Sequence, residues 1–252
     1  MSAIDHRTPR AAIAGALLGG AATASYMLPA LAGARPIYLP GSPAPIWPRL
    51  RGLLGVEDAT ASGRGYALTF DDGPHPQGTQ AVLEALDSAH VRATFFLVGE
   101  RVLANPSLAR EIAAAGHGIA LHCHRHRNLL RLTPCQTRED IAAAFDVIAE
   151  HTGRSPELYR PPYGILNAAA LRLARARGWR TLLWSHWGRD WEARATPASI
   201  AARVTAGAGE GAVLLLHDGD DYSATDSWRR TAAALPRVLE TLAELRLAPV
   251  AP

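Results

Sequence analysis

The sequence Tyr66-Ala-Leu-Thr-Phe70 runs directly into Asp71-Asp72-Gly73-Pro74-His75-Pro76, and this junction decides the fold. The first five residues are mostly apolar, aromatic or β-branched, which is typical of a buried strand. The glycine and the prolines that follow cannot continue a strand, so the chain must leave the sheet at the two adjacent carboxylates. The alternative is a solvated turn, because Asp, Gly and Pro are also ordinary turn residues. The remainder of the chain decides between the two interpretations.

Strand-like runs and helix-length amphipathic segments alternate along the chain after this junction. We expect strands at 66–70, 93–98, 119–122, 157–160, 181–184 and 212–217, with 247–250 as a further one. We expect helices at 79–89, up to 116, and at 137–151, 167–177, 197–206 and 227–245. Strands separated by helices form parallel sheets, because a parallel neighbour needs a long crossover connection. About seven such units predict an α/β fold with a closed or nearly closed barrel.

Three regions are expected along the 252 residues. Residues 66–252 hold the regular pattern and are long enough for one large domain. Residues 35–65 are rich in Pro, Gly and Ser, which indicates a linker that docks in places. Residues 1–34 carry basic residues first and no charge from 11 to 34, which suits a secretory signal or an uncleaved anchor. We therefore expect an extracytoplasmic or membrane-anchored protein, with membrane association through residues 11–34; the alternative is a cytoplasmic protein whose first helix packs on the domain.

Charge and cysteine content narrow the function classes. The formal net charge is only +3, and the arginines are scattered along the expected helices, which argues against a nucleic-acid partner. The two cysteines, Cys123 and Cys135, are too few for a disulfide framework. Cys123 lies among histidines, where a metal contact or a reactive thiol competes with a small buried apolar side chain, and we favour the latter.

Ionisable residues recur where the expected strands end. In a parallel barrel the carboxyl ends of all strands open on one face, and such folds carry their chemistry there. Six ionisable side chains are thereby brought to one mouth: Asp71, Asp72, His122, Arg160, Asp190 and His217. Scattered solvated turns would not place them so consistently, so we prefer the strand interpretation of the opening junction.

This set contains ligands for a divalent ion. One carboxylate and two imidazoles suffice for Zn²⁺ and leave positions for water and substrate. In His122-Cys-His-Arg-His126, a helical turn after the strand would put His122 and His126 on one face, whereas a continuing strand would pair His122 with His124. A solvated patch of Arg and His is the remaining alternative. His217 ends an apolar strand and is a candidate acid, with an ordinary pKa of about 6.5.

Five ordered motifs give residues 66 to 245 a specific resemblance to a known family. They are Thr69-Phe-Asp-Asp-Gly-Pro74, His122-x-x-x-His126, Arg160-Pro-Pro-Tyr-Gly164, Asp190-Trp191 and Leu215-Leu-His217. Together they resemble the motifs of the polysaccharide deacetylase family, the NodB-homology carbohydrate esterases. The resemblance implies a deformed (β/α) barrel of about seven parallel strands. It also implies a metal-dependent hydrolase that removes N-acetyl groups from N-acetylated sugars and releases acetate.

The resemblance further implies a role for each motif residue. Asp72, His122 and His126 would hold the metal, usually zinc. Asp71 would act as the general base on the water, and His217 would protonate the leaving amine. The other motif residues would support these steps: Arg160 by orienting Asp71, Asp190 by holding His217, the main chain near Tyr163 by binding the oxyanion, and Leu215 with Trp191 by lining the acetyl slot.

One departure from the family pattern bears on the acid. Trp187 stands where the fourth motif usually carries the first of two aspartates, so His217 must be oriented by Asp190, by Asp218 or by neither. The tryptophans of this region are either core or walls for a sugar ring. We expect the reaction to survive with a specialised substrate, which would be an N-acetylated glycan, an oligosaccharide or a glycosylated metabolite. The alternatives are an O-acetyl esterase acting on acetylated polysaccharide and a carbohydrate-binding pseudoenzyme.

Overall fold

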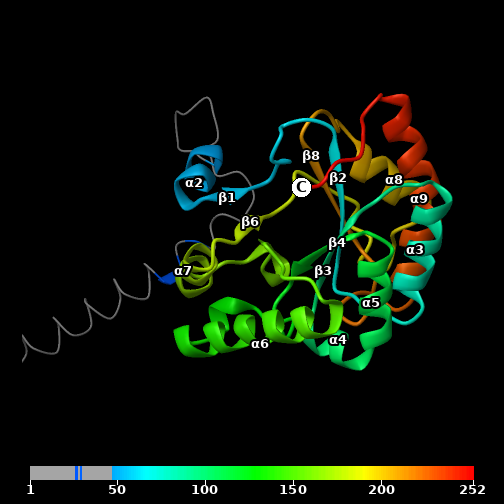
Figure 1. Ribbon diagram of the computed structural model, residues 1–252. Coiled ribbons are helices and arrows are strands. Elements are labelled where there is room, and N and C mark those ends of the chain that lie inside the picture. Colours follow the sequence, from blue (N-terminus) through cyan, green and yellow to red (C-terminus); the bar gives the residue numbers. More distant parts are fainter. Residues whose placement is uncertain (1–25, 28, 30–46) are drawn as a thin grey trace, which may run out of the picture.

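One curled parallel sheet organises the chain in the computed structural model, which describes residues 26–27, 29 and 47–252 (Figure 1). Within these residues the sheet has eight strands in the order β1-β6-β5-β4-β3-β2-β8-β7, and every neighbouring pair in it is parallel. The strands are β1 (Val56–Glu57), β2 (Tyr66–Asp71), β3 (Thr94–Leu97), β4 (Gly118–Leu121), β5 (Leu158–Tyr159), β6 (Arg180–Leu182), β7 (His186–Trp187) and β8 (Ala212–His217). The segment after β1 meets the start of β8 through an isolated bridge between Ala59 and Ala212, so the two ends of the sheet curl toward each other.

Helices cover the outer face of this sheet (Figure 1). They are α2 (Trp47–Leu54), α3 (Gly78–Ser88), α4 (Gly99–Ala104), α5 (Pro106–Ala114), α6 (Pro134–Thr152), α7 (Ala168–Ala176), α8 (Pro197–Thr205) and α9 (Ser227–Glu244), with 3₁₀ turns η2 (Leu129–Arg131) and η3 (Pro162–Gly164). Helix α9 packs between α3 and α8, and α6 packs against α4, α5 and α7. This layering is what a chain of βα units produces when each helix returns over the sheet.

Local sequence signals explain several helix boundaries. Helix α6 begins with a capping box, in which the hydroxyl of Thr133 and the side chain of Gln136 each bond the other residue's backbone N–H. It ends at Gly153, whose φ of 65° is the left-handed conformation that glycine adopts without a steric cost. Pro106 opens α5 at its first turn, where a missing N–H costs nothing. The single helix expected before residue 116 is therefore two helices, α4 and α5.

The core has an inner and an outer part. All six residues of β2 are buried, as expected for a central strand covered on both faces. The inside of the curled sheet is filled by one side chain from each of five strands: Ala67, Phe96, Ala120, Leu182 and Val213. A much larger cluster joins the outer face of the sheet to the helices. The inner set fills the inside of the curled sheet below the carboxyl ends of the strands.

The expected deformed barrel of parallel strands is confirmed, with differences at its ends. Six expected strands are present, and two further strands, β1 and β7, each have only two residues. Residues 247–250 form no strand; Pro249 makes one isolated bridge to Tyr66. Because β1 pairs with β6, the ordered sheet starts inside the region expected to be a linker.

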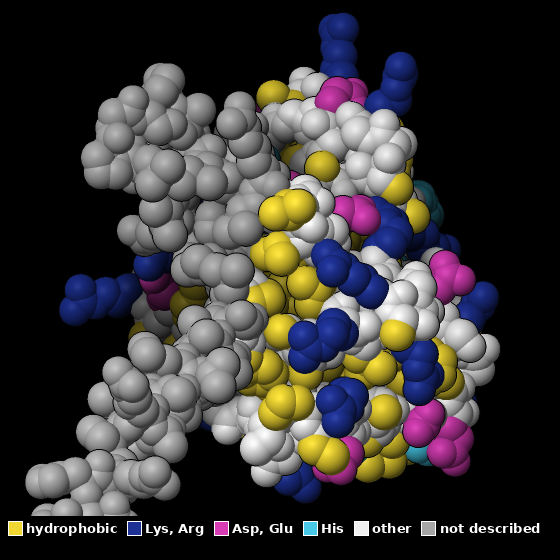
Figure 2. All heavy atoms as spheres, turned by 90° about the vertical axis from the view of Figure 1, so that its left-hand side faces the viewer, with side chains coloured by type: hydrophobic (Ala, Val, Ile, Leu, Met, Phe, Trp, Pro, Cys, Tyr) yellow, Lys and Arg dark blue, Asp and Glu magenta, His cyan; other side chains and the backbone are white. Residues whose placement is uncertain are grey.

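The expected N-terminal segment lies almost wholly outside the described residues. Of residues 11–34, only Tyr26, Met27 and Pro29 are described, and the Tyr26 hydroxyl bonds the main-chain oxygen of Leu132 (2.9 Å). No helix within the described ranges is long and apolar enough to cross a membrane. On the face shown in Figure 2, basic side chains are spread over the surface with apolar side chains between them.

Candidate active site

The strand register brings the opening junction and the last motif side by side. Strand β2 pairs with β8, and in that pairing Asp71 lies opposite His217. On its other side β2 pairs with β3, so Asp71 also lies level with Phe96. Continuing around the sheet, the N–H of His122 bonds the main-chain oxygen of Leu97 at 2.9 Å. The expected convergence of the strand ends on one mouth is therefore present in the structure.

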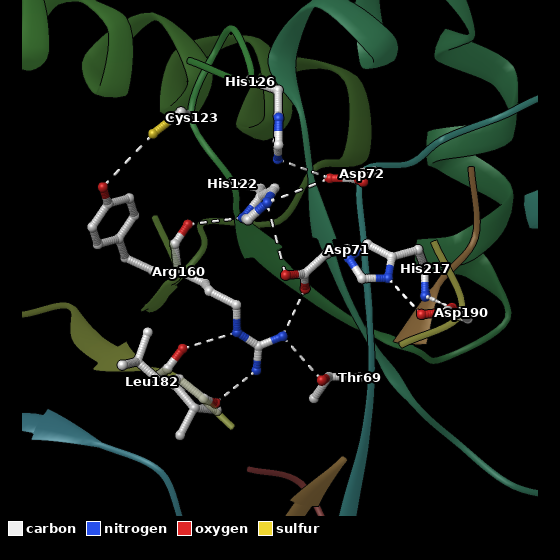
Figure 3. Close-up of polar contacts among 12 residues, drawn as sticks. Thr69, Asp71, Asp72, His122, Cys123, His126, Arg160, Leu182, Asp190 and His217 are labelled. Atoms are coloured by element: carbon white, nitrogen blue, oxygen red, sulfur yellow. Dashed lines mark hydrogen bonds and ion pairs between the residues drawn. The ribbon is translucent and has the colours of Figure 1, made fainter. Parts of the chain in front are cut away.

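Arg160 is a fully buried cation that anchors one side of this mouth (Figure 3). Its Nη1 donates to Asp71 Oδ1 at 2.6 Å and to Thr69 Oγ1 at 3.0 Å. Its Nε and Nη2 donate to the main-chain oxygens of Leu182 and Leu183, each at 2.9 Å. The guanidinium also lies over the ring of Phe96 at 3.8 Å, which is a cation–π distance. Asp71 is thereby fixed by a guanidinium whose other two nitrogens also donate hydrogen bonds, to main-chain oxygens.

Asp72, His122 and His126 meet as a set of ligand atoms (Figure 3). Asp72 Oδ1 lies 3.5 Å from Nε2 of His122 and 3.3 Å from Nε2 of His126. This carboxylate oxygen is buried and has no hydrogen-bond partner in the part of the chain that the structure describes. An orphaned buried oxygen facing two imidazole nitrogens is the arrangement that a divalent cation satisfies. The residues fit zinc, with one carboxylate and two histidines and further positions open to water and substrate.

The surroundings of Asp72 and His126 shift the pKa values of both side chains toward the protonation states that bind a cation. Burial would raise the pKa of Asp72, but the neighbouring imidazole of His122 and the charges of His217 and His126 hold it well below its ordinary value. Burial lowers the pKa of His126 to about 4, with Asp72 opposing the shift. Asp72 is therefore an anion and His126 neutral at physiological pH, and these are the protonation states that bind metals.

The histidine pair matches the sequence expectation, although the local structure does not. Residues 122–128 form bends and no helix after β4. The reversal is made at Cys123, which has a φ of 68°, and it turns His126 back toward His122. The ring of His124 lies against Gly99 and outside the grouped ligand atoms, and the His124 backbone N–H bonds Asp140 Oδ2 at 2.9 Å. Cys123 itself is fully buried beside Tyr159, and burial raises the pKa of its thiol, so it is the small core side chain that we favoured.

Of the two carboxylates that could orient His217, Asp190 is the one that contacts it. Asp190 Oδ1 lies 2.9 Å from His217 Nδ1, and its Oδ2 accepts the His217 backbone N–H at 2.7 Å and the Thr231 hydroxyl at 2.8 Å. Burial opposes charge on the imidazole, but Asp190, with Asp72 and Asp71 farther away, outweighs it and raises the pKa of His217 to about 10. His217 is therefore a cation that can donate a proton.

Asp218 has a different place. Its Oδ2 accepts a hydrogen bond from the Thr79 hydroxyl, away from His217. It is fully buried, and burial raises its pKa to about 7. Gly73 packs directly on this carboxylate, because a Cβ at Gly73 would lie 2.3 Å from Asp218 Oδ2. The glycine of the opening junction is thus needed for close packing as well as for the turn.

The three potential metal ligands and His217 open into one cavity of about 270 Å³. Besides Asp71 and the ligand residues, its wall consists mainly of aromatic and apolar side chains: Tyr163, Trp184, Trp187, Trp191, Leu215 and Tyr222, with Ser223 and His217. The indole of Trp191 meets the His217 ring edge-on at 5.4 Å. The three expected substrate-contacting residues, Tyr163, Trp191 and Leu215, all line this cavity, and the indoles of this region are walls as well as core.

Several residues of the site had no signal in the sequence. Tyr222 and Glu100 lie in segments without a motif, and Thr231 lies on a helix expected to be ordinary cover. Thr69 belongs to the first motif, but nothing in the sequence indicated that it would bond Arg160. A larger hollow of about 630 Å³ lies at the other end of the sheet beside the C-terminal residues. Among the described residues, the grouping of three potential metal ligands lies in the smaller cavity.

Comparison with known sequences identifies close relatives. A family model described as polysaccharide deacetylase matches residues 58–182. The chain is 36% identical over 178 residues to a peptidoglycan-N-acetylglucosamine deacetylase from Bacillus cereus, a match that covers 70% of this chain and 80% of that protein. It is also 36% identical over 186 residues to a chitooligosaccharide deacetylase from a Bradyrhizobium species, covering 71% of this chain and 84% of that protein.

Comparison with solved structures agrees. The fold is similar to that of a family 4 carbohydrate esterase from Streptomyces lividans in complex with acetate, with a TM-score of 0.67 and 35% sequence identity. That match covers 74% of this chain and 92% of the esterase. The parallel half-barrel is therefore shared with that esterase.

Proposed function

The chain belongs to the polysaccharide deacetylase family, and we propose that it is a metal-dependent N-deacetylase acting on glycans that contain N-acetylglucosamine. The single observation that carries this proposal is the meeting of three units in one cavity. These are Asp71, which is bonded to the buried Arg160, the ligand set of Asp72, His122 and His126, and the acid His217. No one unit would suffice for amide hydrolysis.

Zinc is the cation that the donor set favours, and when bound it would polarise the acetyl carbonyl and acidify water. The residues of the chain would do the rest. Asp71, held by Arg160, would accept a proton from water. His217, held by Asp190, would donate a proton to the nitrogen that leaves. The left-handed turn at Tyr163 (φ 60°) would place main-chain groups beside the substrate oxygen.

The shape of the site supports a sugar substrate. Trp184, Trp187 and Trp191 form a connected aromatic wall, with ring centroids 5.9 Å and 5.3 Å apart along the series. Sugar rings pack their apolar faces on such walls. A groove of about 570 Å³ adjoins the cavity past His126 and Tyr163, which gives room for neighbouring sugars of an oligosaccharide or polymer. The relatives act, by their names, on peptidoglycan and chitooligosaccharides.

Two alternative functions, an O-acetyl esterase and a carbohydrate-binding pseudoenzyme, fit the site less well than an N-deacetylase. An O-acetyl esterase could use the same cavity, but an alkoxide needs protonation less than an amine does, and the pairing of His217 with Asp190 favours the amide. A carbohydrate-binding pseudoenzyme would not need a base held by a buried arginine. We further propose that the protein works outside the cytoplasm, because residues 11–34 have the composition of an export or anchoring segment.

The test uses the full chain loaded with one equivalent of Zn²⁺ and measures acetate released from chitooligosaccharides, peptidoglycan and acetylated xylan. We expect release from at least one of the first two, faster than from xylan. Asp71→Asn should lower kcat by about 10²–10⁴-fold while zinc content is unchanged. Zinc binding without acetate release from any of these glycans would contradict the proposal and favour the pseudoenzyme; faster release from xylan would favour the esterase.

A further inference from the structure

The two histidines that face Asp72 are held in different ways (Figure 3). Nδ1 of His122 lies 2.9 Å from the main-chain oxygen of Arg160. Such a bond on the far ring nitrogen is how metal-binding histidines are ordinarily oriented. Nδ1 of His126 is buried and, within the described ranges, has no hydrogen-bond partner. Its ring must therefore be oriented by packing.

Two tyrosines pack on the ring of His126. Tyr222 stacks on it with ring centroids 4.2 Å apart and an interplanar angle of 14°. Tyr163 meets it at 4.5 Å and 67°. A near-parallel stack opposes rotation of the imidazole, because rotation would drive the ring edge into the phenol face. Tyr163 is 55% exposed, whereas Tyr222 is half-buried and tethered.

Tyr222 is tethered from the first turn of α4. Its hydroxyl donates to Glu100 Oε1 at 2.7 Å. The adjacent residues form a second contact, because Arg101 Nη1 lies 2.5 Å from Asp221 Oδ1. Two consecutive residues of the helix thus bind two consecutive residues of the loop after β8. Two adjacent contacts fix the direction of the loop relative to α4 as well as its distance from α4.

A third contact holds the same loop one residue earlier. His75, from the opening junction, has Nδ1 accepting the N–H of Gly78 at 2.9 Å, so in the neutral ring the proton is on Nε2. Nε2 lies 3.3 Å from Asp220 Oδ1. Residues 220, 221 and 222 are therefore each bound by a side chain from another element. We call residues 220–222 the tethered loop.

The first turn of α4 also holds the segment that carries the histidines. The backbone N–H groups of Gly99 and Glu100 donate to the main-chain oxygens of Cys123 (3.0 Å) and His124 (2.9 Å). One helical turn therefore binds the histidine segment through its backbone and the tethered loop through its side chains. The distance between the two loops, and with it the stack of Tyr222 on His126, is set by this turn.

We propose that Tyr222 is a positioning residue for His126, and that Glu100 acts through Tyr222 by fixing its phenol against the imidazole. The role rests on the proposed function, since it concerns the metal site of that function. It predicts that the ring of Tyr222 matters more than its hydroxyl. It also predicts that Glu100 matters only while the hydroxyl is present.

The experiment measures the zinc dissociation constant of the full chain by competition with a chromophoric chelator. We expect Tyr222→Ala to weaken zinc binding by about tenfold or more, which is the usual effect of losing a partner that orients a ligand. Tyr222→Phe and Glu100→Ala should each weaken it about two- to fivefold, and the double variant should be no weaker than either single one. Glu84→Ala, an exposed residue on α3, is the matched control and should not differ from wild type.

Two further measurements separate positioning from folding. The melting temperature of each metal-free variant should stay close to wild type. The visible spectrum of the Co²⁺-loaded protein should change in Tyr222→Ala and be restored in Tyr222→Phe. Tyr222→Ala with zinc affinity within twofold of wild type and an unchanged Co²⁺ spectrum would overturn the positioning role while leaving the metal site intact. A wild-type chain that binds no zinc would overturn the metal site and the role of Tyr222 together.

Discussion

The strand side of the site, formed by Asp71, His122 and Arg160, and the loop side, formed by His126 and Tyr222, hold their functional groups by different forces. On the strand side each group follows a paired strand and is bound by directed hydrogen bonds, with Arg160 supplying both its guanidinium and its main-chain oxygen. On the loop side the imidazole is held by a ring stack, and the stacking ring is held from a neighbouring helix.

The difference indicates that the strand side is the more rigid part of the site and the loop side the more adaptable part. Buried hydrogen bonds to a charge are costly to break, so the strand side keeps Asp71, the proposed base, and His122, a proposed metal ligand, in fixed geometry. Ring stacking and surface contacts are weaker and less directional, so the loop side can accommodate changes in sequence or substrate. Substitutions on the strand side should therefore affect folding and turnover strongly, whereas those on the loop side should affect metal affinity and substrate binding.

The largest effect is expected at Arg160. Arg160→Met leaves the Asp71 carboxylate buried without its cation and two main-chain oxygens without donors, so we expect a loss of about 3–5 kcal/mol in the free energy of unfolding. Urea denaturation of the metal-free chain measures it. Adding Asp71→Asn to this variant should recover part of the loss, since the unpaired charge is then absent. A loss below about 1 kcal/mol would remove the distinction between the two sides.

The next effect is expected at Asp190, which lies in the loop after β7 and holds His217 at the end of β8. Asp190→Asn should lower kcat by about 10²-fold and lower the pKa of His217 from about 10 by about 1–3 units. Histidine NMR titration of the metal-free chain measures the pKa. The folded-state pKa of His217 lies above its unfolded value, so its contribution to stability is complete below about pH 6.5 and is lost as the pH rises through 10. In the Asp190→Asn variant the free energy of unfolding should fall less steeply over that pH range. An unchanged pKa of His217 in this variant would rule out the orienting role of Asp190.

A smaller effect is expected at Gly99, where the loop side is supported. A Cβ added there would lie 2.4 Å from His124 Nδ1 and 3.1 Å from His124 Cα, so Gly99→Ala must displace the histidine segment. We expect a loss of about 1–3 kcal/mol in the free energy of unfolding, with weaker zinc binding. Gly52→Ala, where nothing lies within 4 Å of the added carbon, is the matched control. Equal zinc affinity in both variants would show that α4 does not govern the metal site.

The smallest effect is expected at Trp187, in the cavity wall. Its indole is 37% exposed and contacts Trp184 and Trp191, so Trp187→Ala removes one aromatic surface without touching the acid or the ligands. We expect KM for chitooligosaccharides to rise by about three- to tenfold, with kcat changed less than twofold. Steady-state kinetics on a series of chain lengths measures both. A drop in kcat with constant KM would place Trp187 in the chemistry.

The sequence predicted the strand side well for a physical reason. A buried apolar run that ends in Asp71 and Asp72 predicts a strand and the position of its carboxyl end. A parallel sheet brings the carboxyl ends of all its strands to one edge. His122, Arg160 and His217 follow from the same logic, because each comes at the end of a short apolar run. The residues alone left His124 and His126 open as partners of His122, and the family resemblance implied His126; a turn at Cys123 rather than a helix brings it there.

The loop side could not be predicted in the same way. The stack of Tyr222 on His126 depends on contacts from Glu100 and Arg101, residues that are distant in sequence from both and that carry no motif. Strands β1 and β7 were missed because two residues are too few to show a period. Contacts of this kind are set by tertiary packing, which a single sequence does not display.

The first turn of α4 has a consequence for redesign of the site. Because Gly99, Glu100 and Arg101 bind the histidine segment and the tethered loop at once, these segments form a single transplantable unit. A graft that exchanged the loop after β8 alone would leave two charged side chains facing a foreign partner. Grafts that move all three segments together should keep their metal, and libraries that vary substrate preference are best confined to the indole wall.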